Sequence, residues 1–588
     1  MVTIKKYIRY LEKIKLLLGI NSKQIPFMIS IFLFSSILDL VGIGLIAPYI
    51  SLLIDFDGFL ESGFYQLLLS IGLELDKSKL LIFLSMLLLL VFLIKAIIGI
   101  FINRTILQFC YNQGADLRSL LMEAYVSLKY KDYIQRNSSE YIHRIQQLAS
   151  DFSHGVLQSL LRLISEAIVV FAIIIFLAWH SLETVFVLVL ILASSGILYD
   201  RFFKVKLHKY GRLANEYTKD MIQAVHEGIE GLKEIRVLGH EPHFLARVSN
   251  NAKKFGNVSV KSQVISTAPR YVIESMLVLF IVIIVISSVS SGERLDTLIP
   301  MFGIFAFASI RILPSVNQII LAVGRIRFGL HSINLLYEDV EKYTKRKSNI
   351  DFIDSTKDIE NSRFESLVMK DVHFSYNKHK NILNGISLNI NAGESIGLIG
   401  PSGSGKTTMI DVLLGLLEVD SGSISLNNIN IENNVVSLRS KVAYLPQQVF
   451  LIDSSLKNNI ALGVKESEID DKKVMDSIFR SNLSGFISEL SDGVDTVIGE
   501  RGIRISGGQR QRVALARAFY HAREILIMDE STSALDNNTE NEIVNEIKSI
   551  KGSITTIVIA HRLSTLKYCD RVYELKNGKI YRLDNFSS

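Results

Sequence analysis

A glycine-rich segment carries the strongest chemical signal in this sequence, Gly400-Pro401-Ser402-Gly403-Ser404-Gly405-Lys406-Thr407-Thr408. It fits the pattern G-x-x-x-x-G-K-[ST], and it lies between a predicted buried strand at 394–399 and a predicted helix at 409–416. Glycines in such a loop let several backbone N–H groups face one concave surface, and the helix adds its positive N-terminus. We therefore expect the loop to bind the phosphates of ATP. The residues expected around the phosphates are Gly400, Ser402, Gly403, Ser404, Gly405, Lys406, Thr407 and Thr408.

Two residues of this segment have individual roles in that prediction. The Lys406 ammonium reaches the β- and γ-phosphates, and the Thr407 hydroxyl is a ligand for Mg²⁺. A glycine-rich turn that matches the pattern by accident is the alternative, and the residues further along the chain argue against it.

Polar residues at the ends of two later apolar runs complete a hydrolytic set. The run 525–528 ends in Asp529 and Glu530, and the run 554–560 ends at His561. Asp529 is placed to hold Mg²⁺ through water, and Glu530 to orient or deprotonate the attacking water. His561 is placed to contact the γ-phosphate. The predicted chemistry is ATP hydrolysis, with ATP and Mg²⁺ as cofactors.

Two further motifs lie between the glycine-rich loop and these carboxylates. Gln447 follows a predicted strand at 441–446, and Ser506-Gly507-Gly508-Gln509 precedes a predicted helix. Each motif alone is a weak signal. Their order and spacing within one segment make coincidence an insufficient explanation.

Length and composition indicate several domains, of which one lies in a membrane. The chain has 588 residues, 49% of them hydrophobic, and the excess lies before about residue 330. The formal net charge of +6 is small for this length, so it does not argue for a nucleic-acid partner. The cysteines, Cys110 and Cys569, are far apart and imply neither a disulfide framework nor a metal cluster.

Six long apolar runs each approach or exceed the roughly 20 residues that a membrane-spanning helix needs. Basic residues gather in the connections 104–155 and 201–268, so the positive-inside rule places both termini and the C-terminal half in the cytosol. The prediction is a multi-pass protein of the plasma membrane, in a bacterium the inner membrane. The runs lie at about 25–54, 80–103, 156–179, 182–203, 269–290 and 296–325.

The segments around these runs predict further helices. Residues 3–20 place apolar and basic side chains at helical spacing, which predicts an amphipathic helix in the membrane interface; a solvated surface helix is the alternative. The two cytosolic connections look helical, and their tips at 130–133 and 228–234 are short turns that we expect to contact another domain. The outer connection carries a short predicted helix at 64–69.

These observations divide the chain into four parts. The fold class is an α-helical transmembrane domain followed by an α/β P-loop nucleotide-binding domain. The predicted parts are an amphipathic interfacial helix at 1–22, a transmembrane domain of six helices at 23–330, a charged linker at 331–365 and the nucleotide-binding domain at 366–588.

Ionisable residues inside the apolar runs are functional candidates because their burial in a membrane is costly. Arg162 and Glu166 are four residues apart, as are Arg270 and Glu274, so each pair could neutralise itself on one helix face. For both pairs a purely structural role stays open.

Lys95 and Arg311 differ, because neither has an acidic residue three or four positions away. Asp39 is the obvious counter-charge within the apolar runs, and we expect that it cannot cancel both cations. Two uncompensated cations facing a cavity would suit an anionic substrate. Snorkelling, or pairing with Asp39, is the alternative.

The motifs in this order resemble the ATP-binding cassette (ABC) transporter family, and six spans before one cassette resemble an exporter-type half-transporter. The resemblance implies that Tyr376 stacks on adenine and that Gln447, in the Q-loop, contacts the metal and the catalytic site. It implies that the signature binds the γ-phosphate of ATP held by the opposite subunit, through Ser506, Gly507, Gly508 and Gln509. It also implies that 499–502 touches the membrane domain and that 533–536 forms the D-loop. Ile505 stands where the family usually has leucine, a conservative change.

One cassette completes neither ATP site, so the resemblance implies a dimer with two ATP molecules sandwiched head to tail. A homodimer is expected, because the catalytic glutamate, signature serine and histidine are all present in this chain. Heterodimerisation stays open.

The membrane half is most similar to bacterial lipid-linked oligosaccharide flippases of the PglK type. The similarity rests on three local patterns, at 92–96, 268–270 and 311–317. It implies that Lys95, Arg270 and Arg311 form a basic cavity for the pyrophosphate of a lipid-linked glycan, with membrane lipid around the protein. Lys95 stands where arginine is expected, which keeps the charge but loses the bidentate geometry.

The leading prediction is ATP-driven export or flipping of a lipid-linked oligosaccharide or a similar anionic amphipathic lipid. The alternative within the family is a general multidrug, lipid A or peptide exporter, although a basic cavity disfavours apolar or cationic substrates. ABC-type ATPases of DNA repair or translation lack such spans, and an ATP-gated channel of this architecture would be recognised by its ion conductance.

Overall fold

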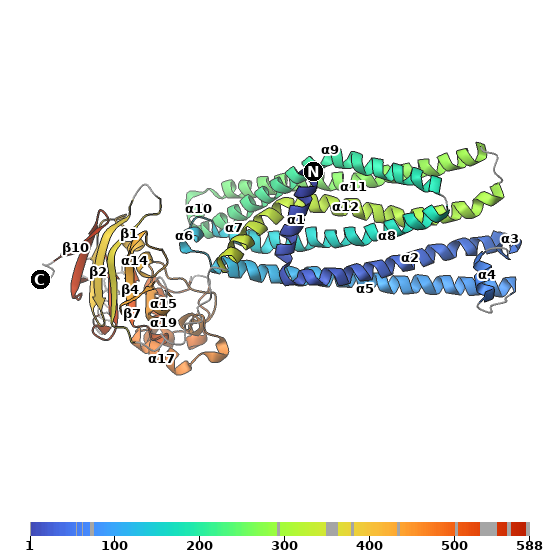
Figure 1. Ribbon diagram of the computed structural model, residues 1–588. Coiled ribbons are helices and arrows are strands. Elements are labelled where there is room, and N and C mark those ends of the chain that lie inside the picture. The colour runs from blue at the N-terminus through green and yellow to red at the C-terminus, as the bar shows by residue number, and fades with distance from the viewer. Residues whose placement is uncertain are drawn as a thin grey trace. The chain divides into compact units, whose positions relative to one another are not determined.

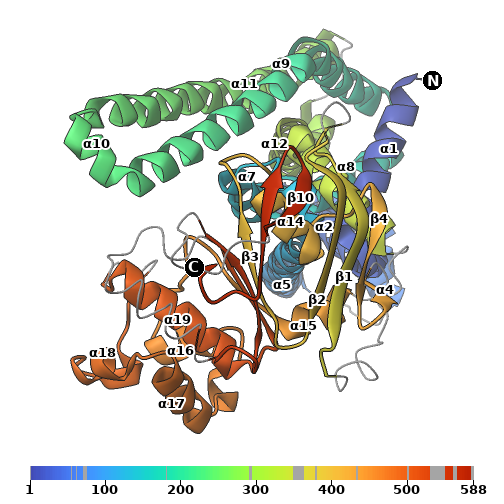
Figure 2. The same ribbon diagram turned by 90° about the vertical axis from the view of Figure 1, so that its left-hand side faces the viewer.

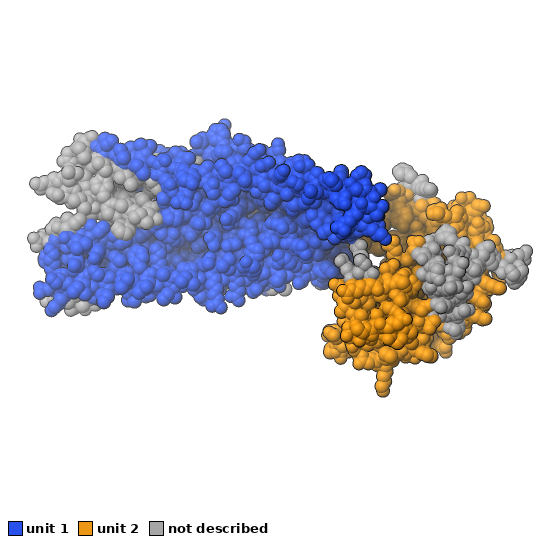
Figure 3. Space-filling model, turned by 180° about the vertical axis from the view of Figure 1, so that it is seen from behind, with its two compact units in different colours: residues 1–128, 136–349 blue, residues 129–135, 350–588 orange. Residues whose placement is uncertain are grey.

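The computed structural model divides the chain into two compact units, coloured separately in Figure 3. Unit 1 comprises residues 1–128 and 136–349, and unit 2 comprises 129–135 and 350–588. The short segment 129–135 therefore belongs with the C-terminal unit. The structure describes residues 2–54, 56–60, 63–70, 76–180, 182–290, 295–347, 363–377, 381–431, 435–499, 502, 504–529, 548, 550–560 and 566–583.

Unit 1 is built from long helices that run side by side (Figure 1). Each predicted span falls on one of them, because a long apolar stretch in a membrane satisfies its own backbone hydrogen bonds as a helix. Within the described residues, four helical stretches are long and apolar enough to cross a membrane, namely Asn21–Leu53, Lys77–Val126, Ser138–Trp179 and Arg311–Lys345. The count of six spans stays a prediction. The long helices are α2 (Ile25–Ile54), α5 (Lys77–Val126), α8 (Gln158–His180), α9 (Leu182–Glu230), α11 (Glu241–Ser290) and α12 (Leu295–Lys347).

Shorter helices precede and connect these. The amphipathic helix predicted at the N-terminus is confirmed as a helix, α1, and its apolar residues Ile14, Leu17 and Leu18 are buried in one core with residues of α5 and α12. The predicted outer helix is confirmed as α4. The shorter elements of unit 1 are α1 (Val2–Leu18), η1 (Gly19–Gln24), α3 (Phe56–Leu60), α4 (Gly63–Ser70), α7 (Ser138–His143), the π-helical turns η2 (Arg144–Leu148) and η3 (Asp151–Leu157), and α10 (Leu232–Leu238).

The expected linker at 331–365 is corrected in its first half. Helix α12 continues without a break to Lys347, and residues 348–362 lie outside the described part of the chain. Ile333, Leu336 and Val340 are at most 2% exposed. Their spacing of three and four residues forms an apolar stripe that the many charges between them concealed.

A buried ionic cluster holds this end of α12 in unit 1. Asp339 accepts a hydrogen bond from Arg144 at 2.6 Å, from Tyr125 at 2.7 Å and from Arg136 at 3.1 Å. Arg144 also pairs with Glu140 at 2.6 Å. Because a buried carboxylate is stable only when it is paired and hydrogen-bonded, this cluster fixes where the charged end of α12 packs.

The long helical extensions predicted for the connections 104–155 and 201–268 are confirmed as helices. Helix α5 runs to Val126 and α9 to Glu230. The first extension is followed by the four-residue helix α6 (Tyr130–Tyr133), and the second turns at Gly231 into α10.

Unit 2 contains two sheets. The first is antiparallel with strand order β2-β1-β4-β5, and the second has the order β10-β9-β3-β8-β7-β6. In the second sheet β9, β3, β8, β7 and β6 are parallel, and only β10 pairs antiparallel among the described strands. The strands are β1 (Ser366–Phe374), β2 (Leu383–Asn391), β3 (Ser395–Ile399), β4 (Ser421–Leu426), β5 (Ile429–Asn430), β6 (Val442–Leu445), β7 (Ile525–Asp529), β8 (Thr555–Ile559), β9 (Arg571–Lys576) and β10 (Lys579–Leu583).

The helices of unit 2 fall into two groups. In Figure 2, α14 lies beside the sheets, whereas α16 to α19 gather apart from β1, β2 and β4. The second group has its own apolar core, which includes Leu456, Ile478 and Val513. The helices are α14 (Lys406–Leu413), α15 (Val435–Lys441), α16 (Leu456–Ile460), η5 (Glu466–Glu468), α17 (Asp471–Arg480), α18 (Ser484–Ser488), η6 (Gly493–Asp495) and α19 (Gly507–Tyr520).

Candidate functional site

The glycine-rich loop connects the buried strand β3 to helix α14, which is the strand–loop–helix arrangement that the sequence predicts. Gly403 and Gly405 have φ angles of 77° and 103°, a region that residues with a Cβ rarely adopt. A Cβ on Gly405 would also lie 3.0 Å from a methyl group of Ile382. The backbone N–H groups of the loop and the N-terminus of α14 therefore form an anion-binding concavity.

Two side chains of the loop fit a phosphate ligand. The Lys406 ammonium is buried and donates hydrogen bonds to the carbonyls of Gly400 at 2.8 Å and Pro401 at 3.2 Å, so its charge lies at the centre of the loop. The Ser404 hydroxyl is buried and has no hydrogen-bond partner among the described residues. An oxygen acceptor such as a phosphate would satisfy it.

The order of the parallel strands brings the other predicted residues to the same edge of the sheet. The carboxyl ends of β3, β8, β7 and β6 are neighbours, and ligands of such sheets bind at that edge. The loop follows β3, Asp529 ends β7, and Gln447 lies two residues beyond the end of β6 and is exposed. Glu530 and His561 follow β7 and β8 in the sequence, and both lie outside the described residues.

Asp529 is positioned by a hydrogen bond that the sequence gave no reason to expect. The Tyr444 hydroxyl, on β6, donates to a carboxylate oxygen of Asp529 at 3.1 Å. Burial and the neighbouring Asp529 charge raise the pKa of Tyr444, so it remains a donor. Asp529 and the exposed Thr407 are oxygen donors of the kind that Mg²⁺ prefers, and they fit the predicted metal.

Tyr376, expected to stack on adenine, lies beside the loop helix. Its ring is half-buried and packs edge-on against Phe374, with ring centroids 5.0 Å apart. Its hydroxyl is 3.4 Å from the Thr408 hydroxyl at the start of α14. A purine next to the phosphate loop could therefore use the ring as a stacking surface.

The predicted signature forms the N-terminus of α19. Ser506 caps the helix by accepting a hydrogen bond from the Gln509 N–H at 3.2 Å, and the Gln509 side chain accepts from the Ser506 N–H at 2.7 Å. Because this reciprocal capping fixes the first turn, Gly507 and Gly508 present their N–H groups at a helix N-terminus. Ser506 is exposed, as a residue acting on a second subunit's ligand would be.

Helix α6, one of the two tips expected to contact another domain, belongs to unit 2. Tyr130 packs against the core that contains Phe374, and burial followed by the charge of Asp411 raises its pKa. Lys131 donates to the carbonyl of Ser375 at 3.2 Å, directly before Tyr376. The segment therefore contacts the end of β1 beside the loop.

In unit 1, the ionisable residues of four helices meet in one cluster. Asp39 on α2 is 1% exposed, lies 2.5 Å from the Lys95 ammonium on α5, and accepts from Arg311 on α12 at 3.0 Å. Ser315 donates to Glu166 on α8 at 2.7 Å, and Glu166 lies 3.6 Å from Arg311. Asp39 contacts both cations, because its Oδ1 lies 2.5 Å from Lys95 and accepts a hydrogen bond from Arg311 at 3.2 Å, and its Oδ2 accepts from Arg311 at 3.0 Å. The pairing with Asp39 that the sequence left as the alternative is therefore present, and Glu166 supplies a second negative charge beside Arg311.

The cluster nevertheless has a cationic accessible side. Lys95 and Arg311 are each 27% exposed, whereas the Asp39 carboxylate beneath them is almost fully buried. Glu166 is 24% exposed and adds a negative charge on the exposed side of the cluster. An anion could reach both cations without displacing Asp39.

The remaining membrane candidates separate into two cases. Arg270 pairs with Glu274 on its own helix at 2.8 Å, as the spacing suggested, and its side chain is 57% exposed. Arg162 instead donates to Asn103 at 3.1 Å, which leaves Glu166 to the cluster. No interaction among the described residues joins Arg270 to Lys95 or Arg311.

Comparison with known proteins identifies both units. Residues 41–309 match the family model described as "ABC transporter transmembrane region", and residues 383–533 match the model described as "ABC transporter". The fold resembles a solved structure described as a bacterial Atm1-family ABC exporter with ATP bound, with a TM-score of 0.77. The match covers 96% of each chain at 21% sequence identity, so it supports the fold alone.

Curated relatives match over most of their length. An ATP-dependent lipid A-core flippase from Saccharophagus degradans is 29% identical over 88% of this chain and 86% of its own. A protein of the same name from Ralstonia nicotianae is 30% identical over 71% of this chain and 70% of its own.

Proposed function

Because this chain belongs to the ABC transporter family as an exporter-type half-transporter that hydrolyses ATP, we propose that it moves an anionic, glycan-bearing lipid across the plasma membrane. The observation that carries this proposal is the cluster around Asp39. It presents two partly exposed cations, Lys95 and Arg311, inside a helical membrane unit. Placing charges in a membrane unit costs free energy. Charge-assisted hydrogen bonds to a bound phosphate or pyrophosphate would offset that cost.

The proposed lipid is a lipid-linked oligosaccharide with a pyrophosphate. Its anionic group would displace Glu166 from Arg311 and contact Lys95, while Asp39 keeps both cations in place. Arg270, exposed on α11, would join only by exchanging Glu274 for the ligand. Lipid A is the second candidate, since relatives carry the name lipid A-core flippase and a phosphorylated glycolipid has the same anionic chemistry.

For the ATP site, we propose that the loop N–H groups and Lys406 hold the β- and γ-phosphates and that Tyr376 stacks on the base. Mg²⁺, held by Thr407, Asp529 and Gln447, would neutralise phosphate charge. Glu530 would orient or deprotonate the attacking water, and His561 would contact the γ-phosphate. The signature residues Ser506, Gly507, Gly508 and Gln509 would close on ATP bound by the other subunit.

We propose a homodimer with cytosolic cassettes. The turn after α9 exposes apolar residues, with Ile229 70%, Val237 81% and Leu238 66% exposed. A cassette of the second copy would cover them. Closure of the cassettes would then act on the membrane helices through both tips.

The test is ATPase activity in proteoliposomes, with and without a polyprenyl-pyrophosphate glycan. The informative variant changes all four charges at once, Asp39→Asn/Lys95→Met/Glu166→Gln/Arg311→Met. The Lys95→Met/Arg311→Met double variant would leave the buried Asp39 carboxylate without its two cations. Arg212→Gln, in an exposed pair with Glu216, is the control.

The proposal predicts that the glycan lipid stimulates the wild type and the control, and that the neutral variant loses the stimulation. Stimulation that persists in the neutral variant would remove the cluster from the substrate site. A wild type stimulated by lipid A and not by the polyprenyl lipid would favour the second candidate.

A further inference from the structure

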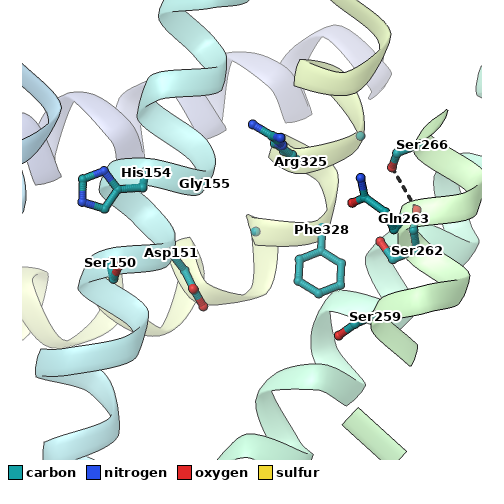
Figure 4. A pocket seen from close by; sticks show the side chains of 12 residues that line it. Ser150, Asp151, His154, Gly155, Ser259, Ser262, Gln263, Ser266, Arg325 and Phe328 are labelled. Carbon is teal, nitrogen blue, oxygen red and sulfur yellow. Dashed lines mark hydrogen bonds between the residues drawn. The ribbon is translucent and has the colours of Figure 1, made fainter. Parts of the chain in front are cut away.

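A polar cavity of about 360 Å³ lies in unit 1 between η3, α11 and α12 (Figure 4). None of its lining residues belongs to the cluster around Asp39. The volume is at the lower end of the range for small-molecule sites, about 300–1,000 Å³. The lining residues are Ser150, Asp151, His154, Gly155, Ser259, Ser262, Gln263, Ser266, Gly324, Arg325, Phe328 and Gly329.

The backbone explains why this space exists. The π-helical turn of η3 widens the helix at Asp151–Leu157, and such turns often mark functional sites. Gly324 and Gly329 let α12 approach its neighbours, because a Cβ there would lie 2.7 Å from the Ser266 hydroxyl and 2.4 Å from a Val156 methyl group. Gly155 differs, since a Cβ on it would meet no atom within 4 Å. The helices are thus in close contact at Gly324 and Gly329 and separated at Gly155.

The lining residues of the cavity include both hydrogen-bond donors and hydrogen-bond acceptors. Asp151 and Gln263 approach the space around Phe328 from opposite sides in Figure 4. One Asp151 oxygen accepts from Gln147 at 2.9 Å, which leaves the second available. Arg325 is exposed and has no ion-pair partner among the described residues. The cavity therefore combines a cation, a carboxylate, an amide and several hydroxyls around one aromatic ring.

The lining residues determine which part of an amphipathic lipid, its acyl chain, sugar or phosphate, the cavity could bind. An acyl chain needs walls of aliphatic side chains, and none of the lining residues has one; Phe328 is the one apolar side chain among them. A sugar needs hydrogen-bond donors and acceptors at several positions and an aromatic face for its C–H groups, which Asp151, Gln263 and Phe328 could supply. A phosphate needs a guanidinium, and Arg325 is free to bind it in a bidentate manner.

We propose that this cavity is a binding site for a glycosyl phosphate, with Arg325 on the phosphate and Asp151 and Gln263 on sugar hydroxyls. This inference rests on the proposed function in identifying the glycosyl phosphate as the headgroup of the transported lipid. The cluster around Asp39 and this cavity would then contact different parts of one headgroup. A free sugar phosphate has the same chemistry, so the experiment separates the two sources.

The first arm measures binding of soluble glucose 1-phosphate to the full chain in nanodiscs, by isothermal titration calorimetry. The variants are Arg325→Gln, which removes the cation at an exposed position, and Gly155→Leu, which fills the open space. Gly256→Leu on α11 is the matched control, because a Cβ there also meets nothing within 4 Å and the residue does not line the cavity.

We expect the wild type and Gly256→Leu to bind, and both cavity variants to bind at least about tenfold more weakly, as loss of one charge-assisted contact implies. The inference is overturned if the wild type does not bind, or if Arg325→Gln and Gly155→Leu bind as the wild type does. Arg325→Gln keeps the test valid should Gly155→Leu fail to fold.

The second arm compares ATPase stimulation by polyprenyl pyrophosphate with and without a sugar. We expect the sugar to lower the half-stimulating concentration for the wild type and to have no effect in Gly155→Leu, whose side chain fills the space that the sugar would occupy. If glucose 1-phosphate binds but neither lipid stimulates, the proposed function fails and the cavity is a site for a free sugar phosphate. If both lipids stimulate equally in wild type and variant, the proposed function stands and this inference fails.

Discussion

At the scale of single residues, Asp39 organises the charges of unit 1. One buried carboxylate serves two cations from different helices, at 2.5 Å from Lys95 and 3.0 Å from Arg311. The sequence placed all three in apolar runs, but Asp39 and Arg311 are 272 residues apart along the chain. No local pattern could show that one carboxylate would meet both. Only the packing of α2 against α5 and α12 decides it.

Replacing Asp39 with asparagine should therefore destabilise unit 1. The variant leaves Lys95 and Arg311 with Glu166 as their remaining described acid, and removal of one buried partner costs about 3–5 kcal/mol. We expect a lower midpoint of thermal unfolding in detergent. Glu274→Gln, in the exposed pair with Arg270, is the control and should cost less than about 1 kcal/mol. Equal midpoints for Asp39→Asn and the wild type would show that these contacts do not stabilise the fold.

A second residue-scale prediction concerns Glu524 in unit 2. Burial raises the pKa of this carboxyl, but hydrogen bonds from Lys441 and the Phe364 N–H outweigh burial, and the net pKa is lowered. A carboxylate with a lowered folded-state pKa stabilises the fold above its unfolded pKa and loses that contribution as pH falls through the folded value.

Glu524→Gln should therefore lower the stability of unit 2 by about 1–3 kcal/mol at pH 7.5, because the ion pair between Glu524 and the buried Lys441 is lost. The deficit should shrink at an acidic pH below the lowered folded-state pKa of Glu524, where the wild-type carboxyl is protonated too. Unfolding midpoints of the full chain at both pH values provide the measurement. A deficit that does not change with pH would contradict the ionic explanation.

At the scale of elements, short segments proved harder to predict from sequence than long ones. The apolar runs and the strand–loop–helix around Lys406 were predictable, because hydrophobic period and glycine spacing are local properties. The C-terminal end of α12 was not predictable as a helix, because charged residues surround its buried Ile333, Leu336 and Val340. The cavity at η3 was not predictable either, because a π-helical turn leaves no recognisable sequence pattern.

Helix α6 provides an element-scale prediction. Seven residues of unit 2, at 129–135, interrupt the chain between α5 and α7 of unit 1, so they give the cassette one direct route for acting on unit 1. Tyr130→Ala/Lys131→Ala should remove the partly buried ring and the hydrogen bond to the Ser375 carbonyl. We expect ATP hydrolysis without lipid to continue and its stimulation by lipid to fall at least about fivefold, as loss of one coupling contact implies.

Lys129→Ala is the matched control for α6. Lys129 pairs with Glu418 at 2.6 Å, but both side chains are mostly exposed, so the pair contributes little. Normal lipid stimulation in Tyr130→Ala/Lys131→Ala would exclude α6 as the coupling element and leave the turn after α9 as the candidate.

At the scale of the whole molecule, the sequence predicted the class of protein better than its substrate. Two sheets, a helical group and long membrane helices follow from motifs of fixed order, and both family models match. The substrate depends on side chains brought together by tertiary packing, and two residues proposed for hydrolysis, Glu530 and His561, lie outside the described part of the chain. Transport therefore has to be measured.

The most direct measurement is ATP-driven movement of a fluorescent polyprenyl-pyrophosphate glycan across proteoliposome membranes, read by protection from an external quencher. The account predicts that wild-type protein translocates the lipid and that Glu530→Gln, which removes the proposed base, slows it at least about a hundredfold. The account is contradicted if the wild type hydrolyses ATP but leaves this lipid in place, or if Glu530→Gln translocates it at the wild-type rate.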